Sequence, residues 1–161
     1  RDTDYGAPIL LTALLAAFLQ PDAASGLAIT FAAVALHDAA RDWKIGVTAI
    51  IAFFASLVMA MHGELPPQPF VERVFASLIL SGAPLAAAAL FAALAAGFFI
   101  ILCLIPAPRP VRYALAGSLF GFALMALLSH YPTPLIGYGA APVLGYGLAL
   151  GLNRTNHPPP G

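Results

Sequence analysis

The chain has 161 residues, of which 61% are hydrophobic and 9% are charged, with seven basic and seven acidic residues and a net charge of zero. A soluble domain carries about 25% charged residues, so these side chains are too few to cover a soluble globule of this length. The composition excludes a soluble enzyme, a nucleic-acid-binding protein and a disordered chain. It indicates an all-α, multi-pass membrane protein.

Six apolar segments, separated by short polar or proline-rich breaks, are predicted to be helical spans. They cover approximately residues 5–20, 23–40, 45–62, 84–105, 111–129 and 135–152. About 20 residues are needed to cross the hydrocarbon core, so the first two segments are short for a span. We expect them to form either two short tilted spans or one re-entrant hairpin. Asp22, which follows a proline break, is expected to cap the second helix.

The apolar stretch over residues 70–105 is too long for one span, so we divide it at Ser81–Pro84. Apolar residues recur at helical spacing over 70–81, with Glu72 and Arg73 between them. This pattern predicts a short amphipathic helix that lies in the membrane interface. The spans and this helix form one transmembrane domain over residues 1–152. A polar, proline-rich tail follows over 153–161.

The distribution of basic residues predicts the orientation of the chain. If six spans alternate in direction, Arg73 lies on one side and the other six basic residues lie on the opposite side: Arg1, Arg41, Lys44, Arg109, Arg112 and Arg154. Cytoplasmic loops are enriched in lysine and arginine, so both termini are predicted to be cytoplasmic. Short loops and alanine- and glycine-rich spans favour a bacterial inner membrane.

The first candidate site lies at the predicted outer rim, where His62 and His130 end two spans and Glu64 follows the first of them. Imidazoles and a carboxylate at one depth can bind a divalent metal ion such as zinc, or can act as acid and base on a substrate. The alternative is that these polar residues only mark the headgroup level at the helix ends. No two of them have the i, i+4 spacing of ligands on one helical turn.

The second candidate site lies at the cytoplasmic end of segment two. His37 and Arg41 are four residues apart and are expected on one helix face, while Asp38 and Asp42 form a parallel pair. The group predicts either a gate or phosphate-contacting site, or a solvated helix end and turn.

Two GxxxG pairs, Gly117/Gly121 in segment five and Gly147/Gly151 in segment six, predict close approach between helices. Small residues at this spacing let helix backbones pack closely in lipid.

Segment six also carries two tyrosines at a spacing that places them on one face, Tyr138 and Tyr146. Pro142 lies between them and frees a backbone carbonyl from the helical hydrogen-bond pattern. We expect segment six to be either a tightly packed helix or the wall of a pore or substrate path.

No aspartate, glutamate, lysine or arginine lies in the middle of any predicted span. This argues against a proton relay, an ion-coupled carrier and a voltage sensor, which need an ionisable group inside the membrane. We therefore predict a small, non-catalytic membrane component. It would act as a permease or channel subunit, or as an accessory subunit of a larger complex, with no cofactor.

The expected partners are the lipid bilayer and other membrane subunits or further copies of the chain, and no nucleic acid is expected. The alternative is a small membrane enzyme or metal-handling protein that uses the outer-rim residues.

Overall fold

The computed structural model describes residues 5–62, 74–128 and 145–147, without the side chains of Phe75 and Ala76. Within these ranges every regular element is a helix. The helices are α1 (Gly6–Leu19), α2 (Ala23–Ala40), α3 (Trp43–His62), α4 (Val74–Leu80), α5 (Pro84–Phe99), its π-helical continuation η1 (Ile100–Leu104) and α6 (Arg109–Leu128). The prediction of an all-helical chain is confirmed for this part of the sequence.

Four of the described helices are long and apolar enough to cross a membrane: α2, α3, α5 with η1, and α6. The multi-pass membrane class predicted from composition is therefore supported. Helix α1 has 14 residues, which correspond to about 21 Å and fall short of a hydrocarbon core of about 30 Å. Apart from residues 145–147, segment six lies outside the described residues. The six-span count and the re-entrant hairpin remain predictions.

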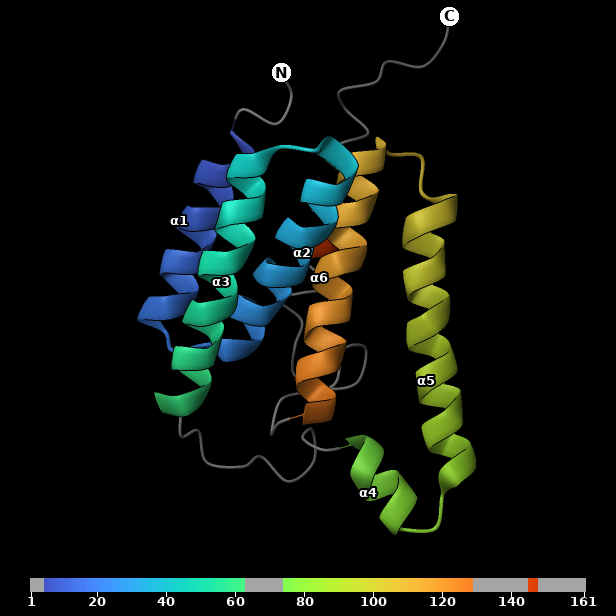
Figure 1. Ribbon diagram of the computed structural model, residues 1–161. Helices are drawn as coiled ribbons and strands as arrows, with labels where there is room; N and C mark the ends of the chain where they lie inside the picture. Colours follow the sequence, from blue (N-terminus) through green and yellow to red (C-terminus); the bar gives the residue numbers. More distant parts are fainter. Residues whose placement is uncertain (1–4, 63–73, 129–144, 148–161) are drawn as a thin grey trace, which may run out of the picture.

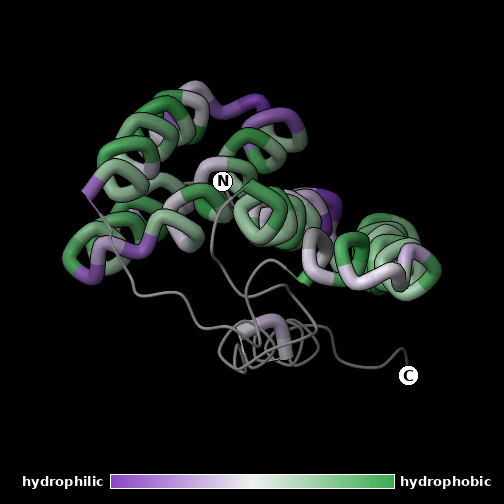
Figure 2. The backbone as a smooth tube through the Cα atoms, turned by 90° about the horizontal axis from the view of Figure 1, so that it is seen from below, coloured by the Kyte–Doolittle hydropathy of each residue, from purple (hydrophilic) through white to green (hydrophobic). Residues whose placement is uncertain are grey.

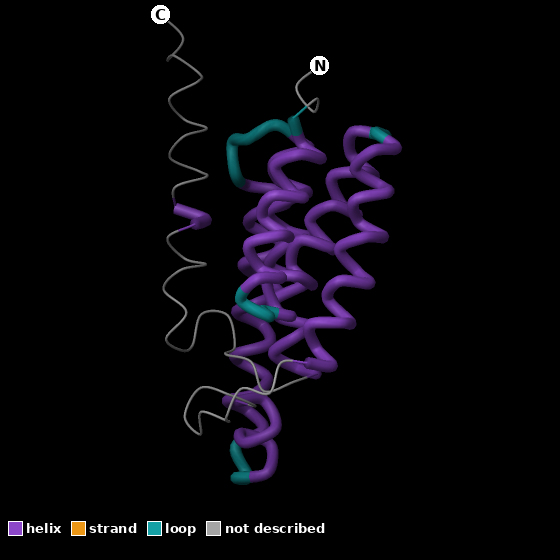
Figure 3. The backbone as a smooth tube through the Cα atoms, turned by 90° about the vertical axis from the view of Figure 1, so that its left-hand side faces the viewer, coloured by secondary structure: helices purple, strands orange, loops and turns teal. Residues whose placement is uncertain are grey.

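Helices α1, α2, α3 and α6 lie side by side, and α5 runs along the outer side of α6 (Figure 1). Viewed along the helix axes, α5 stands apart from the group formed by α1 to α3 (Figure 2). The turns join neighbouring helices at the two ends of the bundle (Figure 3). We call the end with the α2–α3 turn and the η1–α6 turn the basic end, because it carries Arg41, Lys44, Arg109 and Arg112.

Small residues set the distance between α2 and α6. A Cβ atom added at Gly121 would lie 2.6 Å from the Ala28 Cα, and one added at Gly117 would collide with the carbonyl oxygen of Phe31. The helix backbones approach so closely that neither position has room for a side chain. The close packing predicted for this GxxxG pair is confirmed.

Helices α2 and α3 meet through another glycine, which the sequence analysis did not single out. A Cβ atom at Gly26 would lie 2.6 Å from the Ser56 Oγ and would also collide with the Met59 side chain. Met59 is almost fully buried against this seam. Glycines therefore bring α2 close to both α3 and α6, which makes α2 the central helix of the described bundle.

The described core contains three buried polar side chains, Thr30, Thr48 and Ser56. Each hydroxyl donates to the carbonyl oxygen four residues earlier in its own helix, at 2.6–2.9 Å. Such bonds satisfy a hydroxyl without a partner helix or water, so the core can stay dry.

The start of α2 is fixed by Asp22, as predicted. Its Oδ1 accepts hydrogen bonds from the backbone N–H groups of Ala24 and Ser25, both at 3.1 Å, and its Oδ2 accepts one from the Ser25 hydroxyl at 2.6 Å. These bonds satisfy N–H groups that have no acceptor within the first turn of a helix.

Within the range 70–81 of the predicted interfacial helix, the structure has a helix, α4, whose bounds are Val74–Leu80. Residues 70–73 lie outside the described residues. Helix α4 lies at the end of the bundle opposite the basic end and leads into α5 through a turn at Gly82, which has a φ of 78°. Its placement in the membrane interface stays a prediction.

Candidate functional site

His62 ends α3 with an exposed side chain, at the end of the bundle opposite the basic end. Its Nδ1 lies 2.8 Å from the carbonyl oxygen of Val58. A carbonyl oxygen can only accept, so Nδ1 donates. Glu64 and His130, the other two residues of the outer-rim candidate, lie outside the described residues. In the described ranges no three histidine, cysteine or acidic side chains are close enough to hold a metal ion, so the rim site remains a prediction.

The second candidate site forms the turn between α2 and α3. Arg41 adopts a left-handed conformation with a φ of 56° and ends α2. It therefore leaves the helix face that His37 occupies, and it pairs with Asp38 at 3.2 Å. The predicted common face of His37 and Arg41 is not formed, because the helix ends before Arg41 can extend it.

The other two residues of this group are used in backbone hydrogen bonds. The Nδ1 of His37 lies 2.7 Å from the carbonyl oxygen of Asp42, and the Asp42 carboxylate accepts from the Lys44 N–H at 2.9 Å. The His37 ring also covers Gly46, where an added Cβ would lie 3.1 Å from the ring. These contacts favour the interpretation of a helix end and turn.

Tyr146, one of the three described residues of segment six, contacts α6. The Tyr146 hydroxyl donates to the carbonyl oxygen of Leu115 at 2.9 Å and is hydrogen-bonded to the Ser118 hydroxyl. At Gly147 an added Cβ would meet no heavy atom within 4 Å, so this glycine makes no close approach within the described structure.

The remaining candidates of segment six are Tyr138, Pro142 and Gly151, and they lie outside the described residues. A packing or lining role for segment six therefore stays a prediction.

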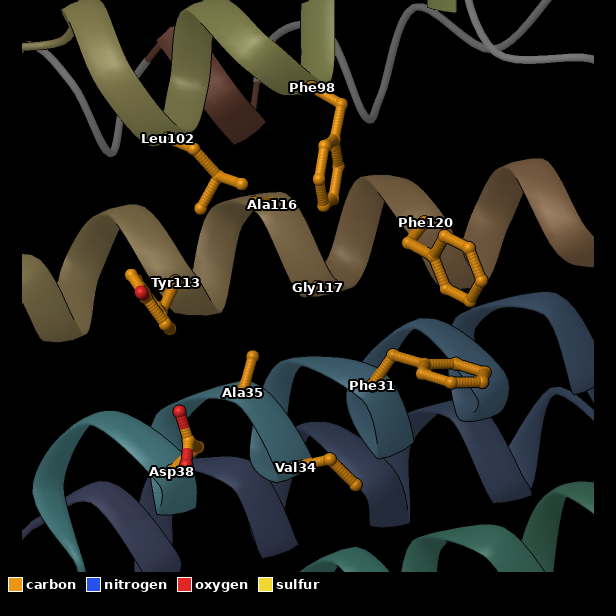
Figure 4. A pocket seen from close by; sticks show the side chains of 10 residues that line it. All are labelled: Phe31, Val34, Ala35, Asp38, Phe98, Leu102, Tyr113, Ala116, Gly117 and Phe120. Atoms are coloured by element: carbon orange, nitrogen blue, oxygen red, sulfur yellow. The ribbon is translucent and has the colours of Figure 1, made fainter. Parts of the chain in front are cut away.

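A groove of about 310 Å³ that the sequence analysis did not predict lies between α2, the α5–η1 helix and α6 (Figure 4). Its volume is at the lower end of the range of small-molecule sites, which is about 300–1,000 Å³. Most of its walls are apolar, and the lining residues are Phe31, Val34, Ala35, Asp38, Phe98, Leu102, Tyr113, Ala116, Gly117 and Phe120.

The groove exists because small residues face large ones across it. Ala35, Ala116 and Gly117 form its floor where α2 and α6 meet, while Phe98 and Leu102 reach towards them from α5 and η1 (Figure 4). The short side chains of the floor cannot fill the space that the larger residues leave. Alanine and glycine at these positions are visible in the sequence, but the position of α5 is not.

The groove has a polar end at the basic end of the bundle, where Asp38 and Tyr113 line it. Asp38 is paired with Arg41. The guanidinium of Arg109 lies over the Tyr113 ring, 4.9 Å from its centroid. Arginine and tyrosine in this arrangement attract each other through a cation–π interaction.

A third arginine reaches the wall of the groove from α6. The Nη1 of Arg112 donates to the carbonyl oxygen of Leu102 at 2.7 Å. Leu102 lies in the π-helical turn that ends the α5–η1 helix, where carbonyls lack intrahelical donors. The Nε of Arg112 is buried and has no hydrogen-bond partner within the described structure. Each of these three arginine side chains thus contacts a residue that lines the groove.

No family model, curated protein or solved structure matches this chain. The function proposed below therefore rests on the exposed helix faces and on the groove.

Proposed function

We propose that this chain is a small, non-catalytic subunit of a larger membrane assembly, either an accessory subunit or a component of a transport complex. The observation that carries the proposal is the exposed face of α5. In the most apolar 18-residue stretch of Pro84–Leu104, 17% is buried inside the protein. The corresponding stretches of the other three candidate spans are 28–44% buried.

The exposed surface of α5 combines large apolar side chains, Leu85, Phe91 and Phe99, with a row of alanines. Ala88, Ala92 and Ala96 recur every fourth residue and are all exposed, while Leu90 and Leu94 are buried. Lipid tails are as apolar as the helices, so association within a membrane depends on close packing rather than on the hydrophobic effect. Small residues every fourth position permit that close approach, which favours another transmembrane helix as the neighbour of this face.

The described core does not favour a transport path through the bundle itself. Its buried hydroxyls are satisfied within their own helices, and the charged residues of the described ranges lie at helix ends. A transport role would therefore involve the interface with a partner, in agreement with a subunit function.

The proposal is tested by the mass of the native assembly. We would produce the tagged chain at native level in its own host, extract it with a membrane-solubilising polymer that retains lipid, and measure the particle mass. The expected result is a complex whose protein mass is well above the 16.6 kDa of the chain.

Ala92→Leu fills the exposed alanine face and is expected to release the chain as a monomer. Ala60→Leu is the matched control, because Ala60 is an exposed alanine of α3 outside this face. A wild-type chain that runs as a monomer would contradict the proposal. A complex that survives Ala92→Leu would show that α5 is not the interface.

A further inference from the structure

We propose that the groove between α2, α5–η1 and α6 binds one acyl chain of an anionic glycerophospholipid, with the lipid phosphate at the basic end. This site is independent of the proposed subunit function, because none of Ala88, Ala92 and Ala96 lines the groove. Three observations support it: the chemistry of the walls, the charge at one end and the depth of the groove.

The walls suit a hydrocarbon chain. Phe31, Phe98 and Phe120 lie around one part of the groove, and Val34 and Leu102 continue the apolar surface towards the basic end (Figure 4). Phe31 and Phe120 contact each other edge to face, with ring centroids 4.9 Å apart. An acyl chain gains dispersion contacts with such surfaces without placing a polar group in the hydrocarbon layer.

The charge at the polar end suits a phosphate. Arg41 already balances Asp38 in an ion pair, which leaves the guanidinium groups of Arg109 and Arg112 without a carboxylate partner among the described residues. Helix α6 also begins at Arg109, and the amino end of a helix carries a partial positive charge. A lipid with a net negative headgroup therefore complements this end better than a zwitterionic lipid does.

The groove is short enough to lie within one leaflet. Along α6 the lining residues extend from Tyr113 to Phe120, and along α2 from Asp38 to Phe31. Seven residues of helix correspond to about 10 Å, against about 15 Å for half of the hydrocarbon core. A headgroup at the basic end would thus place its acyl chain within the same leaflet.

The test uses the purified full-length chain and two lipid probes with identical acyl chains, phosphatidylglycerol and phosphatidylcholine. Native mass spectrometry counts the lipids that stay bound after equilibration with equal amounts of both. We expect one retained lipid per chain and a preference for phosphatidylglycerol.

Val34→Trp tests the groove, because this exposed side chain lines it and a larger one would fill it. The variant is expected to lose the retained lipid. Val58→Trp is the matched control, since Val58 is similarly exposed at 43% against 49% for Val34 and lies on α3. Circular dichroism checks that both variants keep the helical content of the wild type.

Arg109→Gln and Arg112→Gln test the headgroup contact and keep every side chain that lines the groove. Each is expected to lower the phosphatidylglycerol preference about fivefold, because a basic residue near anionic lipid contributes about 1 kcal/mol. Lys44→Gln removes a charge from the same end without touching the groove and is expected to leave the preference unchanged.

Retention of the lipid by a folded Val34→Trp variant would overturn the proposal, since the occupant would then lie elsewhere. An unchanged lipid preference in both arginine variants would also overturn it. If Val34→Trp instead changed the oligomeric mass and left lipid retention intact, the groove would be a contact between copies of the chain, and the proposal would be wrong.

Discussion

At the scale of single residues, Asp22 shows how one side chain determines where a helix begins. Proline at position 21 interrupts the apolar pattern, and the carboxylate that follows accepts three hydrogen bonds from the first turn of α2. Both signals are local, so the sequence alone predicts the start of α2.

Asp22→Ala should lower the free energy of unfolding by about 1 kcal/mol, within the range of about 0.5–2 for the loss of an N-cap. The reason is that the N–H groups of Ala24 and Ser25 lose their acceptor. The change can be measured by circular dichroism during unfolding in mixed micelles of mild detergent and sodium dodecyl sulfate. Asp22→Asn keeps an acceptor oxygen and should remain close to wild type. Equal losses in both variants would contradict the capping role.

At the scale of elements, the seam between α2 and α6 depends on two glycines, and Gly121 is the sharper test. In Gly121→Ala the new Cβ would lie 2.6 Å from the Ala28 Cα and 2.7 Å from the Leu27 carbonyl oxygen. Backbone atoms cannot rotate away, so the helices must separate. Overpacking of this kind costs about 1–3 kcal/mol of unfolding free energy, which the same mixed-micelle titration measures.

Gly97→Ala is the matched control for this seam. Gly97 lies in α5, and a Cβ there would meet its nearest neighbour, the Leu119 side chain, at an ordinary 3.8 Å. Alanine is also the better helix former. We therefore expect Gly97→Ala to keep the stability of the wild type or to raise it. If both alanine variants were equally stable, the two backbones would not be in close contact at Gly121.

The elements that the sequence predicts well are those whose signals are local. Apolar runs bounded by polar and proline residues give α2 at its observed bounds, and the spacing of Gly117 and Gly121 predicts a close seam. Neither pattern identifies the helix that lies across the seam. For the same reason, the hydrogen bond from Tyr146 to Leu115 of α6 could not be predicted from the sequence. The groove depends on how far α5 stands from α2, which no residue pattern encodes. Likewise, the left-handed ending at Arg41 separates two residues whose spacing placed them on one face.

At the scale of the whole molecule, the basic residues of the described ranges gather at one end of the bundle. The basic residues in the described ranges are Arg41, Lys44, Arg109 and Arg112, and all four lie at the basic end. Asp22 and His62 lie at the opposite end. Because lysine and arginine accumulate on the cytoplasmic side, the orientation that we predict from the sequence places the basic end in the cytoplasm.

The orientation can be tested with two cysteines at opposite ends of the α5–η1 helix. The chain has a single cysteine, Cys103. The Cys103→Ser variant therefore has no thiol for a maleimide to label and serves as the unlabelled background. In this background we would introduce Ser81→Cys and Pro108→Cys separately, since both positions are exposed and lie in turns on either side of this candidate span.

A membrane-impermeant maleimide added to intact spheroplasts should label Ser81→Cys and should label Pro108→Cys only after permeabilisation. Reporter fusions at Gly63 and Tyr131, which lie outside the described residues, should report the same outer side as Ser81. Labelling of Pro108→Cys in intact spheroplasts would contradict the orientation. It would also place the proposed lipid phosphate in the outer leaflet, because the groove's arginines lie at the same end as Pro108. The orientation of the bundle thus decides which leaflet supplies the lipid.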